Sequence, residues 1–183
     1  MVKITIGTKE NPVRFSYANV YQPVSVNGSD LKYSVSIIIP KSDKKTIKKI
    51  KDAIQKATQE NKDKFGGKVP TNLKTPLRDG DVDREDDEAY ADSYFINANS
   101  KIKPGLVDGD LNLIIDPTEF YSGCYGRVSL TFYAFNVNGN KGIAAGLQNI
   151  MKTADGEPLG GRSSAEDDFA DDSEEADDDD ILG

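Results

Sequence analysis

The segment 126–137, GRVSLTFYAFNV, places two aromatic rings and a cation on one side of a predicted β-strand. Alternation along a strand sends one set of side chains inward and the other outward. The outward set includes Arg127, Tyr133 and Phe135, where a sheet facing water normally carries polar groups. Unpaired bases stack on such rings for about 1–3 kcal/mol each, and cations neutralise the phosphate backbone. The pattern therefore favours binding of single-stranded nucleic acid, with packing of the two rings under a helix or loop as the alternative.

Other aromatic and basic side chains could extend this surface. The sequence has eight tyrosines and no tryptophan, and the tyrosines are interleaved with lysine and arginine. Each position is a weak signal by itself, but together they are typical of a stacking surface. The further candidates are Tyr17, Tyr21, Tyr94, Lys101, Lys103, Tyr121, Tyr125 and Lys141.

Catalytic chemistry has less support. The chain has no histidine, which removes the commonest general base and zinc ligand. The single Cys124 therefore has no imidazole to activate it, and the phosphate-loop pattern GxxxxGK[ST] is absent. We predict a binding protein without a cofactor or bound metal, not an enzyme.

One acidic stretch leaves an enzymatic alternative open. The spacing from Asp79 to Asp83 resembles the start of a calcium-binding loop, but Arg84 stands where glycine is needed and Tyr90 where the bidentate glutamate belongs. Carboxylates do suit Mg²⁺, so a metal-dependent nuclease is the alternative function. Its candidate ligands are Asp79, Asp81, Asp86 and Asp87.

Charge is distributed very unevenly along the chain. The formal net charge is −8, yet residues 163–183 hold 11 acidic residues and no Lys or Arg. Removing them from the totals of 23 basic and 31 acidic residues leaves 23 against 20, a net charge of +3 for residues 1–162. A basic body can bind nucleic acid. A DNA mimic, whose acidic segments would occupy another protein's DNA groove, is a third hypothesis that the basic body disfavours.

The acidic C-terminal segment has few apolar residues and is predicted to be a disordered tail, residues 161–183. Two apolar residues lie at its tip, which simple solubility does not explain. Tethered carboxylates could compete with phosphates for the basic surface. The tip could also dock into a basic-rimmed pocket of a replication or recombination protein. The predicted partner-binding residues are Asp177, Asp178, Asp179, Asp180, Ile181 and Leu182.

The predicted elements that must position these side chains are mostly strands. Alternation and turn signals predict strands over 13–21, 32–39, 93–99, 111–115, 126–137 and 142–150. A helix is predicted from an N-cap at Ser42 to about Lys64, with isoleucines at helical spacing. Residues 66–92 read as one long polar loop.

These elements predict a mainly β fold, residues 1–160, in a five- to six-stranded Greek-key barrel with one inserted helix. The OB-fold is the leading candidate and a β-sandwich is the alternative. No apolar run is long enough to span a membrane, and no signal peptide is recognisable. One cysteine fits a reducing cytoplasm.

The order and spacing of several motifs resemble a phage protein family long catalogued as a domain of unknown function, similar to the replication single-stranded DNA-binding proteins of T-odd phages. The resemblance runs through about residues 10–170. It is carried by KTPLRDGD (74–81), YFINANS (94–100), YSG (121–123), FYAFN (132–136), NKGI (140–143) and GL (146–147).

The resemblance implies an OB-fold that binds single-stranded DNA without sequence preference in phage replication and recombination. It also implies an acidic tail that recruits replication proteins, a homodimer, and action in the cytoplasm of the bacterial host. One departure is that the T-odd relatives end in an aromatic residue, whereas this chain ends Ile181-Leu182-Gly183.

Overall fold

The computed structural model describes residues 1–25, 28 and 30–159. The predicted acidic tail therefore lies outside the described residues. The elements are β1 (Val2–Ile6), β2 (Val13–Val24), β3 (Lys32–Pro40), α1 (Lys44–Glu60), the 3₁₀ helix η1 (Lys62–Phe65), β4 (Leu77–Asp79), α2 (Gly80–Asp83), the 3₁₀ helix η2 (Glu88–Tyr90), β5 (Ser93–Ser100), β6 (Gly105–Val107), β7 (Tyr125–Val137) and β8 (Asn140–Ala154).

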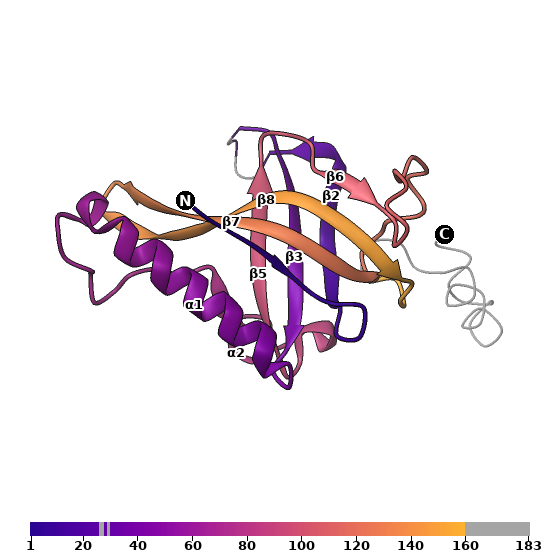
Figure 1. The fold of residues 1–183 in the computed structure, drawn as a ribbon, viewed down its shortest axis with the longest axis horizontal. Helices are drawn as coiled ribbons and strands as arrows, with labels where there is room; N and C mark the ends of the chain where they lie inside the picture. Colours follow the sequence, from indigo (N-terminus) through magenta and orange to yellow (C-terminus); the bar gives the residue numbers. More distant parts are fainter. Residues whose placement is uncertain (26–27, 29, 160–183) are drawn as a thin grey trace, which may run out of the picture.

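Five of the strands close into a barrel. The neighbours run β7, β2, β3, β5 and β8, and a long antiparallel pairing of β8 with β7 completes the ring. β5 and β8 pair in parallel, with Ala98 beside Ala145, and the remaining barrel pairs are antiparallel. Figure 1 shows β7 and β8 crossing in front of β2, β3 and β5. Closure of this ring confirms the predicted OB-fold-like barrel over the β-sandwich.

The barrel interior is filled by the inward sets of the alternating strands. The predicted inward residues of β7 are all buried, as are Val35, Ile37 and Ile39 of β3. Alternation decides which face is buried because neighbouring side chains on a strand point to opposite sides. These inward residues of β7 are Val128, Leu130, Phe132 and Ala134.

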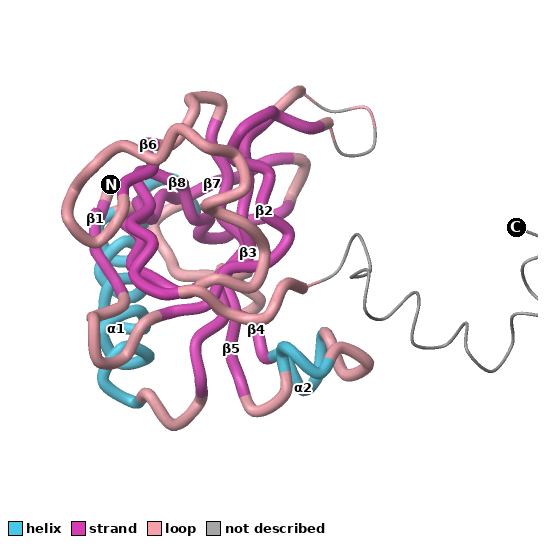
Figure 2. The backbone as a smooth tube through the Cα atoms, turned by 90° about the vertical axis from the view of Figure 1, so that its right-hand side faces the viewer, coloured by secondary structure: helices cyan, strands magenta, loops and turns pink. Residues whose placement is uncertain are grey.

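Helix α1 packs its isoleucine stripe on the barrel and lies beside β1 (Figure 2). Ile47, Ile50 and Ile54 are buried in the main core. The N-cap is Asp43, whose side chain accepts a hydrogen bond from Thr46 N at 3.2 Å, so the predicted N-cap Ser42 is wrong by one residue. The predicted helix end is also too late, because α1 ends at Glu60 and η1 follows it.

The predicted loop over residues 66–92 contains more structure than expected. β4 pairs with β5, and α2 and η2 follow it along the chain. This segment covers a second small cluster of Ile38, Tyr90 and Phe95 on the outer face of the sheet. Such a satellite cluster explains how a polar stretch can be ordered.

Three further differences concern the strands. Residues 111–115 do not form the predicted strand; Leu113 makes only an isolated bridge to Val107 of β6, a strand that the sequence did not indicate. β1, which pairs with β7, was also not predicted. β8 is longer than predicted, reaching Ala154. Within the described ranges, none of the helices has the length and apolar character needed to cross a bilayer.

Candidate nucleic-acid interface

A β-bulge in β2 turns Tyr17 out of the barrel. The pairing of β2 with β3 shifts between Ser16 and Asn19, which inserts one extra residue. Tyr17 has a φ of 47°, in the left-handed region that side chains other than glycine seldom adopt. Tyr17 is 55% exposed, and it is the one aromatic residue in the described part of the chain that is exposed. An exposed aromatic residue with a strained backbone is a candidate for binding a ligand.

The guanidinium of Arg84 stands over Tyr17. The distance from Arg84 Cζ to the ring centroid is 5.3 Å for Tyr17, 5.5 Å for Tyr90 and 5.3 Å for Phe95. A cation within about 6 Å of a ring face is attracted by the ring quadrupole. Arg84 Nε is buried and has no hydrogen-bond partner within the described residues. The pair therefore offers a ring for stacking with a positive charge beside it.

A row of small and polar residues crosses the outer face of the sheet next to Tyr17. Asn19 Nδ2 donates to Ser34 Oγ at 3.3 Å, and Ser34 pairs with Asn99 on β5. The strand register continues this row onto β8, β7 and β1, while the adjacent row points into the core. The row consists of Asn19, Ser34, Asn99, Gly146, Thr131 and Lys3.

Tyr133 borders this row on β7. A Cβ placed on Gly146 would lie 2.5 Å from Thr131 Oγ1 and 3.6 Å from Tyr133 Cε1, so a larger residue there would have to displace the Thr131 side chain. Tyr133 is half-buried, as is Phe135. Phe135 packs towards Gly142 and the backbone of Lys74, which belongs to the predicted loop. Phe135 therefore packs against the loop, as the alternative interpretation of this ring predicts, whereas Tyr133 lies beside the polar row.

Two predicted tyrosines lie against the main core instead. Tyr21 packs there and donates its hydroxyl to Phe120 O at 3.2 Å, and burial raises its pKa. Tyr94 also packs on the main core, with Lys41 Nζ 5.2 Å and Lys51 Nζ 5.6 Å from its ring centroid. A second register shift, between Asn19 and Val24, contains Tyr21, and the two shifts together explain why Tyr17 and Tyr21 do not share one face as strict alternation would require.

Tyr121 and Tyr125 lie at the far end of β7 and β8. Tyr121 donates its hydroxyl to Asp155 Oδ1 at 2.9 Å, and burial raises its pKa. Tyr125 has the guanidinium of Arg14 5.3 Å from its ring centroid. A hollow of about 150 Å³ is lined by Tyr125, Arg14 and Ile38, so Tyr125 and Arg14 lie beside the satellite cluster. Tyr17 instead contacts Arg84, which belongs to the segment that covers this cluster.

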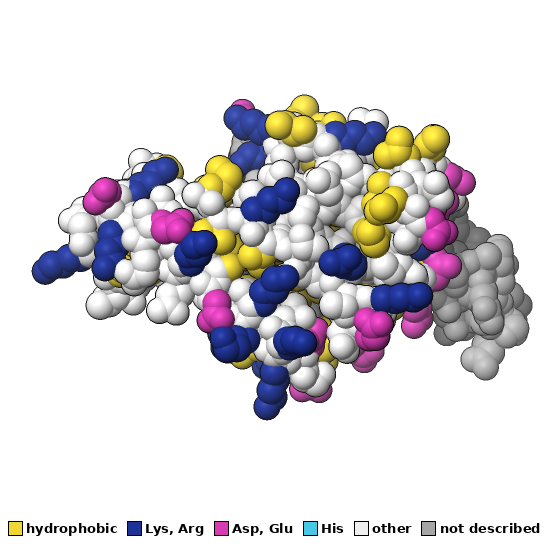
Figure 3. All heavy atoms as spheres, in the orientation of Figure 1, with side chains coloured by type: hydrophobic (Ala, Val, Ile, Leu, Met, Phe, Trp, Pro, Cys, Tyr) yellow, Lys and Arg dark blue, Asp and Glu magenta, His cyan; other side chains and the backbone are white. Residues whose placement is uncertain are grey.

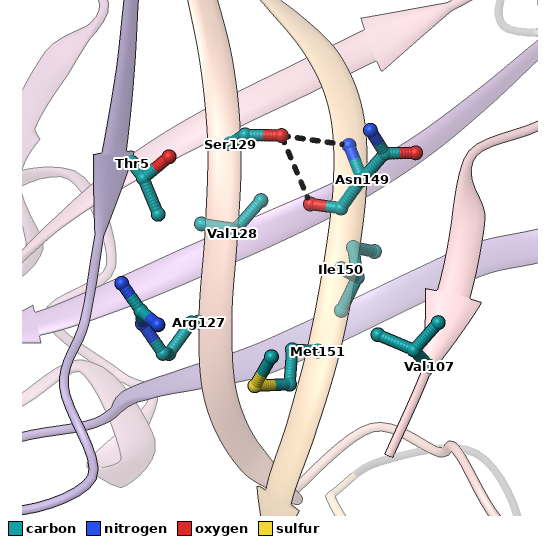
Figure 4. A pocket seen from close by; sticks show the side chains of 8 residues that line it. All are labelled: Thr5, Val107, Arg127, Val128, Ser129, Asn149, Ile150 and Met151. Atoms are coloured by element: carbon teal, nitrogen blue, oxygen red, sulfur yellow. Dashed lines mark hydrogen bonds between the residues drawn. The ribbon is translucent and has the colours of Figure 1, made fainter. Parts of the chain in front are cut away.

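Arg127 occupies a separate site at the bulge between β7 and β8. Figure 4 shows it at a hollow that Thr5 of β1 and Val107 of β6 border. The hollow measures about 170 Å³, and Ser129 and Asn149 hydrogen-bond across it. Arg127 Nε donates to Gly7 O at 2.9 Å. No aromatic side chain lines this hollow, so Arg127 and Tyr133 are not brought into one stacking site.

The predicted lysines are dispersed. Lys101 forms an exposed ion pair with Asp30 at 3.3 Å, and Lys103 is exposed. Lys141 Nζ donates to Phe65 O at 3.4 Å, which ties the β7–β8 hairpin to η1. Figure 3 shows that Lys and Arg side chains are spread over the face that carries α1 and do not gather in one patch.

Comparison with known proteins assigns the chain to a family. The family model described as "Enterobacter phage Enc34, ssDNA-binding protein" matches residues 3–182. The chain belongs to the Enc34 single-stranded DNA-binding family. Protein p50 of Acyrthosiphon pisum secondary endosymbiont phage 1 is 31% identical over 182 residues, which cover 95% of this chain and 97% of that protein.

Solved structures agree with this assignment. The single-stranded DNA-binding protein of bacteriophage Enc34, solved in complex with single-stranded DNA, superposes with a TM-score of 0.74 and 27% identity. The match covers 86% of this chain and 89% of that one. Protein gp2.5 of bacteriophage T7, a single-stranded DNA-binding protein, has a TM-score of 0.60 at 16% identity, covers 94% and 95%, and shares the fold.

Three of the four candidate carboxylates of the nuclease alternative have other partners in this member of the Enc34 family. Asp79 and Asp81 both pair with Lys41 Nζ, at 2.9 and 2.8 Å. Asp87 caps η2 by accepting a hydrogen bond from Ala89 N. Across the described part of the chain, no group of three or more His, Cys, Asp or Glu could hold a metal ion. The arrangement gives the nuclease alternative no support.

Sequence reasoning missed Arg84 and the polar row of this Enc34-family chain. Arg84 lies in an acidic stretch that carries one base among eight acids, so its charge was hidden. Ser34 and Asn99 alternate with inward apolar residues of β3 and β5. That alternation could have identified them as outward residues, but nothing in the sequence shows which outward face meets the bulge.

Proposed function

We propose that this chain binds single-stranded DNA, without sequence preference, across the outer face of β2, β3 and β5. The single observation that carries the proposal is the exposed ring of Tyr17, held at a positive φ beneath the guanidinium of Arg84. A base can stack on this ring while Arg84 meets the adjacent phosphate. The face is also the one that OB-folds use for oligonucleotides.

The strand then follows the polar row towards β8 and β7. Asn99 and Ser34 can hydrogen-bond the backbone or base edges. Tyr133 is a second stacking ring, and Lys3 ends the row with a positive charge. Because rings accept any base, this surface discriminates little between sequences. Among the other predicted contacts, the cations Lys101, Lys103 and Arg127 act through charge alone.

The relatives support a role in phage DNA metabolism. The Enc34 protein was solved with single-stranded DNA, and its match covers most of this chain. The same assignment supports the proposal that the chain binds and protects single strands during phage replication and recombination, in the cytoplasm of the bacterial host.

The acidic segment at residues 163–183 competes with DNA for this surface. The described chain stops at Leu159, whose side chain packs on the satellite cluster of Ile38, Tyr90 and Phe95, next to Arg84. The 24 residues from 160 to 183 span at most about 80 Å when fully extended, so the carboxylates can reach the whole face. Tethering gives them an effective concentration of about millimolar. When DNA displaces them, the tip at Ile181 and Leu182 is free to recruit replication or recombination proteins.

The homodimer stays a prediction. Leu111, Leu113 and Ile115 are exposed and apolar, and they occupy alternate positions of one short segment. Exposed apolar residues of this size are candidates for an interface between copies. Sedimentation of the wild-type chain and of the Leu113→Asp variant would test a dimer through this segment.

Fluorescence anisotropy of labelled oligo-dT, measured across a salt series, tests the function. We expect binding that weakens steeply with salt, because each neutralised phosphate releases condensed counterions. A purified chain that fails to bind the oligonucleotide at low salt would contradict the proposal. Incubation of the purified chain with the same labelled strand and Mg²⁺ should leave the strand intact. Cleavage of the strand would instead support the nuclease alternative.

A further inference from the structure

Lys41, at the end of β3, fastens both ends of the segment 79–92. Its Nζ lies 2.9 Å from Asp79 Oδ1 and 2.8 Å from Asp81 Oδ2, at the start of the segment. At the other end, Lys41 N donates to Asp92 O at 2.9 Å. Asp81 Oδ1 also accepts a hydrogen bond from Asp92 N at 3.0 Å. One lysine and one aspartate thus close the segment into a loop.

The two carboxylates and the lysine stabilise one another's charged forms. The hydrogen bonds that Lys41 donates to Asp81 and Asp79 raise the pKa of Lys41, and the bond to Asp81 lowers the pKa of that carboxyl group. Asp79 in addition caps α2 by accepting from Asp81 N. The cluster is partly open to solvent. Its ion pairs and its hydrogen bonds to the backbone of Asp92 nevertheless involve the same two residues, Lys41 and Asp81.

The closed loop carries Arg84 to Tyr17. The guanidinium is held over three rings, and within the described residues its buried Nε has no hydrogen-bond partner. With no hydrogen bond fixing Nε, the place of Arg84 depends on the backbone that bears it. That backbone is anchored at its two ends by Lys41 and Asp81.

We propose that Lys41 is a positioning residue for single-stranded DNA: it does not touch the strand, but holds the loop that places Arg84 above Tyr17. This inference rests on the proposed function. It assigns a role to the sequence RDGD (78–81), in which the two aspartates are the partners of Lys41.

A double-mutant cycle separates positioning from direct contact. The variants are Lys41→Met, Arg84→Ala and the two combined, with Lys48→Met as the matched control, since Lys48 makes an exposed ion pair with Asp52 on α1. We expect Lys41→Met and Arg84→Ala each to weaken oligo-dT binding about fivefold. The double variant should bind no more weakly than Arg84→Ala alone, and Lys48→Met should bind as the wild type does.

Limited digestion with trypsin gives a second readout that needs no DNA. Without Lys41 the loop opens, so cleavage after Arg84 should be faster in Lys41→Met and in Asp81→Asn than in the wild type or Lys48→Met. Mass spectrometry of the fragments identifies the bond that is cut. A variant that is merely unstable would show accelerated cleavage throughout the chain, which thermal melting would reveal.

The outcomes distinguish this inference from the proposed function. If the losses of Lys41→Met and Arg84→Ala add, Lys41 contacts DNA itself and the positioning role is wrong. Wild-type affinity and wild-type digestion of Lys41→Met would also overturn it. If Arg84→Ala binds as tightly as the wild type, the proposed DNA site fails, even where Lys41→Met still opens the loop to trypsin.

Discussion

At the scale of single residues, Tyr17 combines exposure with a backbone conformation that a tyrosine seldom adopts. Removing its ring in Tyr17→Ala should weaken binding of oligo-dT by about 5- to 150-fold, the equivalent of one lost stacking contact. Tyr17→Phe keeps the ring and should bind nearly as the wild type does. Anisotropy at fixed salt measures both. Equal losses in the two variants would mean that the hydroxyl, not stacking, matters.

Titratable residues lead to a prediction about pH. The sequence has no histidine, burial raises the pKa of Cys124, and the hydrogen bond from Lys41 lowers the pKa of Asp81. No side chain near the proposed DNA site therefore changes charge between about pH 6 and 8. Affinity for oligo-dT at constant ionic strength should be flat across this range, and a marked slope would contradict the assigned site.

The lowered pKa of Asp81 also predicts how the stability of the folded state depends on pH. A carboxyl group whose pKa is lower in the folded state stabilises that state at any pH above its ordinary pKa of about 3.9. The contribution of Asp81 is lost as the pH falls through its lower folded value. Acid, and not mild alkali, should therefore open the loop over residues 79–92.

At the scale of elements, the start of α1 depends on one side chain. Asp43 accepts hydrogen bonds from both Thr46 N and Thr46 Oγ1, whereas Ser42 is exposed just before it. Asp43→Ala should lower the free energy of unfolding by about 1 kcal/mol, the usual cost of losing an N-cap. Ser42→Ala should leave it almost unchanged. Urea denaturation of the two variants measures the difference, and a larger loss in Ser42→Ala would contradict the assigned cap.

At the scale of the whole molecule, charge separation between body and tail predicts autoinhibition. Residues 160–183 hold 11 acidic residues and one arginine, so their removal changes the formal net charge from −8 to +2. A chain ending at Leu159 should bind oligo-dT more tightly than the full chain at low salt, and the difference should shrink as salt screens the carboxylates. Anisotropy of both chains across the salt series measures this effect.

A neutral tail provides the control for that experiment. A full-length variant in which the 11 acidic residues of the tail become Asn and Gln keeps the length but not the charge. It should bind like the truncated chain if the carboxylates compete with phosphates. Unchanged affinity on truncation at low salt would rule out competition and leave recruitment as the role of the tail.

The sequence by itself determined the barrel and the broad function. Strict alternation over β7 identified Val128, Leu130 and Phe132 as core, because strand geometry fixes the face of every second side chain. Isoleucines at helical spacing identified α1 in the same way. Local period, composition and motif order need no knowledge of distant residues, and they were enough to indicate an OB-fold that binds single strands.

Only the tertiary structure decided which rings meet which cations. Two register shifts in β2, one at Tyr17 and one at Tyr21, send Tyr17 outward while Tyr21 stays against the core, and alternation cannot reveal such insertions. Arg84 reaches Tyr17 through a loop that is closed by Lys41, which lies 43 residues earlier in the chain. Contacts of this kind depend on register shifts and on pairs far apart in the sequence. They are therefore properties of the folded molecule, and no local pattern encodes them.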